Sequence, residues 1–268
     1  MFNLTPVVKN LLLINVAVFG ASYLLGLYGE VIQLFALYSI NSDNFRAWQF
    51  VTYMFLHADL WHLFGNMIGL IIFGTWLEEV WGSQRFLQYY LITGLGAAVL
   101  FMGVELVEMR GMRQDVEAFM LEPDPNSFEL VVTEHFESLY ARNYSNINPL
   151  IRAYGDAPDD GELERAAKIK VEQLYMATVN IPMLGASGAV FGVLLAAGLL
   201  FPYRRIMLLF PPIPMRARVL IFFYGAYEIY ALFQRTPNDQ IAHMAHVGGM
   251  LVGFILLSMW GEARNRYQ

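Results

Sequence analysis

The chain has 268 residues, of which 57% are hydrophobic and only 15% are charged, and its mean hydropathy is +0.43. A chain of this length and apolarity is not expected to fold as a soluble domain, so we expect an integral membrane protein. It has no cysteine, which excludes disulfides, a thiol nucleophile and cysteine metal ligands. Its formal charge is −6, and most of the acidic residues lie between Glu105 and Glu172, so we expect no nucleic-acid partner.

Six apolar segments approach the roughly 20 residues that a helix needs to cross about 30 Å of hydrocarbon. They cover residues 10–28, 60–80, 85–106, 187–202, 216–234 and 241–260. We therefore expect an all-α membrane protein, a bundle of six transmembrane helices with a short central fourth helix. Because the fourth segment begins only at Ser187, its serine would lie in a water-filled depression if the helix starts below the membrane surface.

Residues 107–180 have a soluble-looking composition and divide the membrane part into residues 1–106 and 181–268. Their apolar periodicity predicts amphipathic helices over 112–121, 128–142 and 161–176, separated by Pro123, Pro125, Pro149 and Pro158. We expect an extramembrane helical insert on the outer face. Since it immediately precedes Ser187 in the chain, we hypothesise that it modulates substrate access.

Basic residues in the short loops predict the orientation, because cytoplasmic loops are enriched in lysine and arginine. One side would carry Lys9, Arg85, Arg204, Arg205, Arg216, Arg218, Arg264 and Arg266. The other side would carry Arg46 and Arg235. Both termini are then expected to be cytoplasmic, and Ser187 faces the outside near the top of its helix.

The run Gly185-Ala186-Ser187-Gly188 opens the fourth segment and places a serine in the first turn of a membrane helix. We interpret Ser187 as a catalytic nucleophile. The alternative is that the small residues only let helices approach, while the serine bonds a backbone carbonyl. A soluble α/β-hydrolase elbow is disfavoured, because Ala189 stands where that motif has glycine and no strand-turn-helix context surrounds it.

Polar residues open the second segment as well. His62 and Asn66 are four residues apart and share one face of a helix. Polar side chains in a membrane helix are costly and mark a site by default. Hydrogen bonding to a neighbouring helix, as packing, is an equally good explanation of this pair alone.

The sixth segment places His246, Gly249 and Gly253 on one face, and the glycine spacing lets another helix come close. The fourth segment offers matching small residues at Gly188 and Gly192. Contact between these two helices would bring His246 within hydrogen-bonding distance of Ser187, and a serine needs such a neighbouring base to become an activated nucleophile.

Several histidines raise the alternative of a metal site. Against it, His243 and His246 lack a nearby partner carboxylate. His57 and His62 are five residues apart, which turns them to different faces of a helix. We therefore expect no metal, and we assign Glu228, near the outer end of the fifth segment, a structural role.

Four motifs in this order resemble the rhomboid family of intramembrane serine proteases. They are His62-xxx-Asn66, Gly74-xxx-Glu78-xxx-Gly82, Gly185-Ala186-Ser187-Gly188 and Ala245-His246-xx-Gly249-xxx-Gly253. Each motif alone is weak, whereas together they make the resemblance specific. It covers nearly the whole chain outside 107–180 and implies a rhomboid bundle.

The resemblance implies a Ser187–His246 dyad, without a third carboxylate, that hydrolyses peptide bonds in or near transmembrane segments of membrane-protein substrates. It implies an oxyanion site formed by the side chains of Asn66 and His62 and by the backbone N–H of the serine. Phe191 would stack on the histidine ring. No cofactor is implied, the partners would be transmembrane substrates and the lipid bilayer, and the location would be a cell membrane, expected to be a bacterial inner membrane.

The sequence disfavours two other classes of protein. An inactive rhomboid-like protein that binds membrane clients would lack the serine or the histidine, and Ser187 and His246 are both present. A transporter or channel would carry paired ionisable residues near the bilayer midplane, whereas polar residues here gather at the outer ends. The pair Trp48-Gln49 stands where the family commonly has Trp-Arg, so we assign no role to that position.

Overall fold

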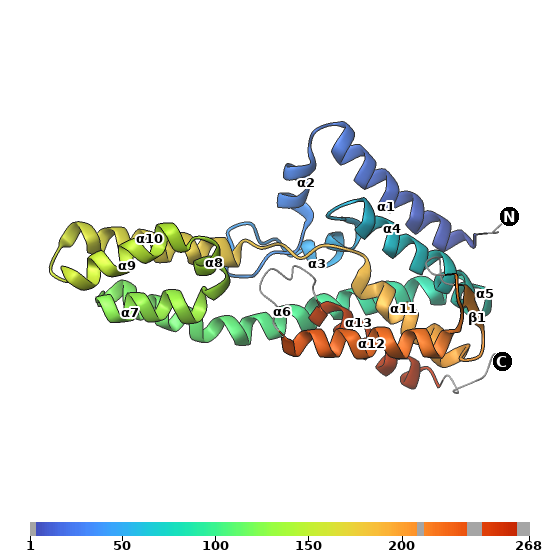
Figure 1. Cartoon of the computed structure of the whole chain (residues 1–268). Coiled ribbons are helices and arrows are strands. Elements are labelled where there is room, and N and C mark those ends of the chain that lie inside the picture. Colours follow the sequence, from blue (N-terminus) through green and yellow to red (C-terminus); the bar gives the residue numbers. More distant parts are fainter. Residues whose placement is uncertain (1–3, 208–211, 235–242, 262–268) are drawn as a thin grey trace. The chain divides into compact units, whose positions relative to one another are not determined.

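The computed structural model describes residues 4–207, 212–234 and 243–261 (Figure 1). The chain forms two compact units. The first contains the chain up to Leu37, residues 46–101 and the chain from Pro182 onward, and the second contains residues 38–45 and 102–181. The second unit therefore begins earlier than the expected insert and also includes a short segment that precedes the second apolar segment.

The first unit begins with α1 (Pro6–Leu24), α2 (Tyr28–Phe35), α3 (Gln49–Thr52) and the 3₁₀ turn η1 (Tyr53–Phe55). Pro6 lies in the first turn of α1, where its missing N–H costs no helical hydrogen bond. The N–H groups of the next two residues, Val7 and Val8, donate to the carboxylate of Glu78 over 2.9 and 3.0 Å. Glu78 therefore satisfies the start of a helix that is distant in sequence.

The second apolar segment is one helical stretch, Leu60–Trp81, made of α4 (Leu60–Gly69), the π-helical turn η2 (Leu70–Gly74) and α5 (Thr75–Trp81). The Asp59 carboxylate caps it by accepting the N–H groups of Trp61 and His62 over 2.7 and 2.9 Å. At the other end Gly82 has a φ of 78°, which favours glycine and turns the chain into α6.

Helix α6 (Ser83–Leu121) continues well past the predicted end of the third segment at residue 106. The separate helix expected over 112–121 is its last part. The intervening residues are mostly good helix formers, and the single Gly111 costs only about 1 kcal/mol relative to alanine. The boundary between the two units falls within this helix.

The first unit ends with α11 (Ser187–Leu200), the strands β1 (Arg205–Met207) and β2 (Pro214–Arg216), α12 (Ala217–Gln234) and α13 (His243–Met259). The strands form an antiparallel pair that the sequence did not predict. Helix α11 is apolar all round and buried along most of its length, and it packs against α4, α12 and α13.

Each of the six predicted segments contains a helix among the described residues, and residues 241 and 242 of the sixth lie outside them. The third helix ends at Leu121 instead of residue 106, whereas the other ends differ by a few residues. Within the described ranges, three helical stretches are by themselves long and apolar enough to cross a membrane: Pro6–Leu24, Leu60–Trp81 and Ser83–Leu121. Helices α11 and α13 are shorter and apolar. The predicted all-α membrane bundle is confirmed, whereas the number of crossing helices stays a prediction.

The second unit contains α7 (Pro125–Leu130), the π-helical turn η3 (Val131–His135), α8 (Glu137–Arg142), α9 (Tyr144–Asp156) and α10 (Gly161–Val179). The prediction that Pro149 separates helices is wrong, because it lies inside α9. Ile147, Ile151 and Tyr154 of that helix are buried in the unit's own hydrophobic core, and this packing outweighs the roughly 3 kcal/mol that an interior proline costs.

Candidate active site

A tight turn places Ser187 as the first residue of α11. Gly185 has a φ of 127°, a conformation that favours glycine, and its N–H donates to the carbonyl of Tyr53 over 3.0 Å. A Cβ atom at position 185 would lie 2.6 Å from Nε2 of His62. The turn therefore requires glycine both for its backbone angle and for the close approach of this imidazole.

Ser187 and His246, predicted as a pair, lie together. The Ser187 hydroxyl oxygen is 2.8 Å from Nε2 of His246. His246 is buried, with only 8% of its surface exposed. The ring of Phe191, one turn further along α11, stacks on the imidazole with centroids 4.2 Å apart and planes 13° from parallel. This stacking restricts the imidazole, so that its Nε2 stays directed at the serine.

Glycines on α11 and α13 bring these two helices together. A Cβ atom at Gly249 would overlap the backbone carbonyl of Gly188. At Gly192 a Cβ atom would lie 3.1 Å from the Gly249 carbonyl oxygen, and at Gly253 it would lie 3.3 Å from the Cα of Gly192. The backbones are thus in direct contact, and any side chain at Gly249 would separate Ser187 from His246.

Two polar residues of α4, His62 and Asn66, are predicted to serve the same site as the serine. Nδ1 of His62 accepts the N–H of Ala58 over 3.4 Å, so a neutral ring carries its proton on Nε2, the atom close to Gly185. Asn66 is 6% exposed, and its Nδ2 has no acceptor among the described residues. The structure thus supplies two side-chain donors, one beside the serine turn and one buried without an acceptor.

A carboxylate lies on the other side of His246. Oε2 of Glu228, on α12, is 2.9 Å from Nδ1 of His246 and 2.5 Å from Nδ1 of His243. All three residues are buried. The expectation that the two histidines lack a partner carboxylate is therefore wrong, and with it the reason for excluding a metal: the three groups offer ligand atoms within 4.8 Å of one another.

Sequence reasoning missed the position of Glu228 because its partners lie 15 and 18 residues away on another helix. A usable signal was present, since an ionisable residue inside an apolar segment is costly and marks a site by default.

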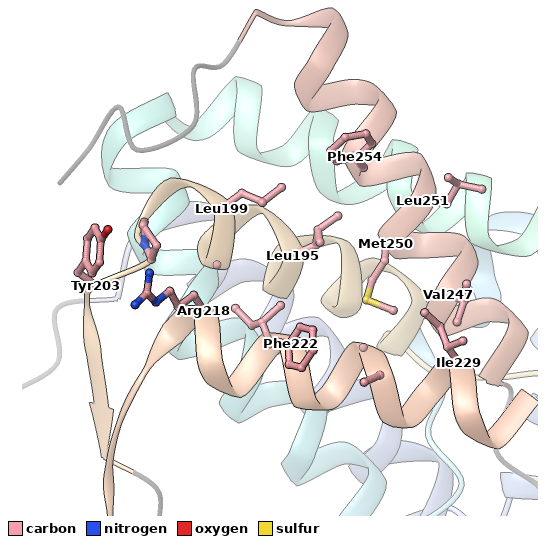
Figure 2. Close-up of a pocket in the computed structure, with 15 residues that line it drawn as sticks. Leu195, Leu199, Tyr203, Arg218, Phe222, Ile229, Val247, Met250, Leu251 and Phe254 are labelled. Carbon is pink, nitrogen blue, oxygen red and sulfur yellow. The ribbon is translucent and has the colours of Figure 1, made fainter.

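An apolar cavity of about 660 Å³ lies between α11, α12 and α13. Figure 2 shows side chains from all three helices lining it, among them Leu195, Phe222 and Met250. Neither Ser187 nor His246 lines this cavity, so the cavity does not contain the serine–histidine pair.

The fold and the site define a helical membrane protein with a serine and a histidine hydrogen-bonded at the start of a buried helix. Residues 44–111 and 166–262, more than half of the chain, match the Rhomboid domain. The chain belongs to the rhomboid family, which is known for intramembrane proteases. This confirms the family that the four motifs resemble.

Curated relatives extend the comparison. The chain is 26% identical over 233 residues to "RHOMBOID-like protein 12, mitochondrial" of Arabidopsis thaliana, covering 86% of this chain and 52% of the relative. It is 28% identical over 229 residues to an "Uncharacterized rhomboid protein", named as mitochondrial, of Schizosaccharomyces pombe, covering 83% of this chain and 53% of the relative. The chain thus spans about half the length of these two relatives.

A shorter match has a name that states an activity. The chain is 35% identical over 67 residues to "Rhomboid-like protease 3" of Toxoplasma gondii, covering 25% of this chain and 26% of the relative. The comparisons support a membrane protein of a protease family. Two of the relatives are named as mitochondrial, so they lend no support to the expected bacterial inner membrane.

Proposed function

We propose that this protein is an intramembrane serine endopeptidase in which Ser187 is the nucleophile and His246 the general base. The observation that carries the proposal is the 2.8 Å hydrogen bond between the Ser187 hydroxyl and Nε2 of His246. A serine hydroxyl is a weak nucleophile until an adjacent base removes its proton. The buried, ring-stacked imidazole is placed to do so.

The reaction follows from this arrangement. As the Ser187 oxygen attacks the scissile carbonyl carbon, Nε2 of His246 takes the hydroxyl proton and then gives it to the leaving amine. Water next attacks the acyl-enzyme while Nε2 of His246 takes its proton. The ester bond then breaks, the carboxylic acid product leaves, and the Ser187 oxygen regains the proton from the same nitrogen. The carbonyl oxygen becomes negatively charged in both tetrahedral intermediates, so it needs hydrogen-bond donors.

We assign three donors to that oxygen: the backbone N–H of Ser187, the Nε2 proton of His62 and the Nδ2 protons of Asn66. The first N–H groups of a helix have no intrahelical acceptor, and the positive end of the helix dipole favours the developing charge. The orphaned amide of Asn66 fits a donor that waits for a substrate oxygen.

The substrates would be membrane proteins cleaved in or near a transmembrane segment. The site would open to the outer face, with both termini on the cytoplasmic side. Two arginines support this orientation, because arginine is enriched on the cytoplasmic side of membrane helices. Arg204, which follows the end of α11, has its guanidinium 4.1 Å from the Trp76 ring centroid. Arg85, at the start of α6, has its guanidinium 4.5 Å from the Trp260 ring centroid.

Labelling with a fluorophosphonate serine probe tests the proposal without a known substrate. In detergent-purified protein we expect the wild type to label, Ser187→Ala to lose labelling completely, and His246→Ala to keep only the slow residual rate of a serine without its base. Ser258→Ala is a matched control, because this serine also lies in an apolar helix, α13, and its hydroxyl donates to the backbone carbonyl of Phe254. Labelling that survives in Ser187→Ala would contradict the proposal, because the probe would then react at another residue. A folded wild type that stays unlabelled would favour an inactive client-binding protein.

A further inference from the structure

Helix α12 carries a buried carboxylate that the proposed dyad does not use. The buried residues of this helix are Ala217, Ile221 and Glu228, while most of its large apolar side chains are exposed. Glu228 is only 4% exposed. Burying a carboxylate in a membrane helix is costly unless it is paired, so its partners indicate what it is for.

Among the described residues, the two side chains that contact the carboxylate of Glu228 are imidazoles of α13. A carboxylate only accepts hydrogen bonds, so Oε2 of Glu228 requires a proton on Nδ1 of His246 and on Nδ1 of His243. With its proton on Nδ1, neutral His246 presents a lone pair on Nε2, the nitrogen 2.8 Å from the Ser187 hydroxyl. This is the only neutral tautomer that can accept the serine proton.

We infer that Glu228 is a positioning residue for the serine chemistry, completing a chain Ser187–His246–Glu228. The carboxylate fixes the tautomer and the orientation of His246 and stabilises the imidazolium that forms when the serine gives up its proton. His243 holds the same carboxylate oxygen from a second direction. The inference rests on the proposed function, since it assumes that Ser187 reacts.

Two other roles would use the same contacts. Glu228 could serve only to attach α12 to α13, or the three groups could ligate a metal ion, for which their atoms are close enough. In neither of these roles does the tautomer of His246 depend on the carboxylate of Glu228. A metal would bind through Nδ1 of each imidazole and would therefore displace the protons that the carboxylate now accepts.

The decisive variant is Glu228→Gln, which keeps the size of the side chain but offers an amide that can donate to Nδ1. Donation there favours the wrong tautomer of His246. We expect the maximal rate of labelling by the fluorophosphonate to fall by about 10²- to 10⁴-fold, the scale of a misplaced tautomer in a serine hydrolase. The concentration of probe giving half the maximal rate should stay within about twofold of wild type, because binding of the probe is unaffected. Glu228→Asp keeps a carboxylate and should recover part of the rate.

Ile221→Ala is the matched control for helix attachment. Ile221 is buried on α12 against Gly198 of α11, and its aliphatic side chain has no group that could hydrogen-bond His246 and set its tautomer. Its truncation should lower thermal stability by loosening α12, yet leave the maximal labelling rate of the folded protein near that of wild type. An equal loss of rate in Ile221→Ala and Glu228→Gln would overturn the inference in favour of a purely structural role.

A double-mutant cycle separates action through His246 from any independent effect. In the His246→Ala background, Glu228→Gln should cause no further loss of the residual labelling, because the carboxylate then has no catalytic imidazole to position. A labelling rate of the double variant that instead fell by the product of the two single losses would contradict the inference. So would a wild-type activity that is lost on dialysis against a chelator and restored by Zn²⁺, which would assign the three groups to a metal.

The outcomes also distinguish this inference from the proposed function. If wild type labels, Ser187→Ala does not, and Glu228→Gln labels at the wild-type rate, the role of Glu228 is refuted while the serine protease stands. If the folded wild type does not label at all, both fall together.

Discussion

Asn66 shows at the level of one residue how a site can be prepared for its substrate. Its Nδ2 is buried and has no acceptor among the described residues, although an unsatisfied buried donor costs about 1–3 kcal/mol. Such a cost is expected at a functional group whose partner arrives with the substrate. The oxyanion of the tetrahedral intermediate would supply that partner.

Asn66→Ala should therefore separate activity from stability. We expect the rate of fluorophosphonate labelling to fall by about 10²-fold or less, since the Ser187 N–H and His62 remain as donors. Thermal stability should change little, because no hydrogen bond made by Nδ2 is lost. Phe64→Ala, an exposed position on the same helix, is the control. Wild-type labelling in Asn66→Ala would remove this residue from the site.

Motifs could predict that Ser187 and His246 lie together, because each lies at a fixed offset from glycines on its own helix. Glu228 could not be placed this way. Its contact with His246 depends on how α12 crosses α13, and no spacing within one helix determines that crossing. The exclusion of a metal failed for the same reason, since it relied on neighbours in sequence.

At the level of elements, Glu78 links two helices that are about 70 residues apart. Its carboxylate accepts the N–H groups of Val7 and Val8, and the hydroxyl of Ser83 donates to it over 2.6 Å. The first N–H groups of α1 have no intrahelical acceptors, and the positive end of the helix dipole favours a carboxylate there. Glu78 thus caps α1 from the end of α5.

Glu78→Ala should destabilise the protein without affecting the chemistry. Each N–H left buried without an acceptor costs roughly 1–3 kcal/mol, so we expect a clear drop in the thermal midpoint in detergent. The folded fraction should still label through Ser187, because Glu78 lies near the opposite end of the Leu60–Trp81 stretch from His62. Glu79→Ala, an exposed neighbour, is the control. Equal midpoints for the two variants would contradict the capping role.

Helix positions were largely predictable, because apolar runs of the required length have few alternatives in a membrane. Helix ends and the insert were less predictable. The chain passes through Pro149 within α9 because Ile147 and Ile151 are buried in the core of the second unit. The pair β1–β2 consists of two strands of three residues each, which are too short to show the alternating pattern that predicts a strand.

At the scale of the whole molecule, the length of Leu60–Trp81 limits how the first unit can lie in a membrane. Its 22 residues, at about 1.5 Å each, span roughly 33 Å, enough to cross a hydrocarbon core of about 30 Å. Ala58 precedes this stretch beside His62, and Gln84 follows it at the start of α6. These two exposed residues should therefore lie on opposite sides of the membrane.

The absence of cysteine from the sequence makes this orientation directly measurable, since single-cysteine variants have no background. In sealed membranes with the outer face exposed, we expect a membrane-impermeant maleimide to label Ala58→Cys at once. Gln84→Cys should label only after detergent opens the membrane, because Arg85 and the other loop arginines favour the cytoplasmic side. Detergent-opened samples control for reactivity of each thiol. The reverse pattern would place Ser187 on the cytoplasmic side, and labelling of both from outside would mean that Leu60–Trp81 does not cross.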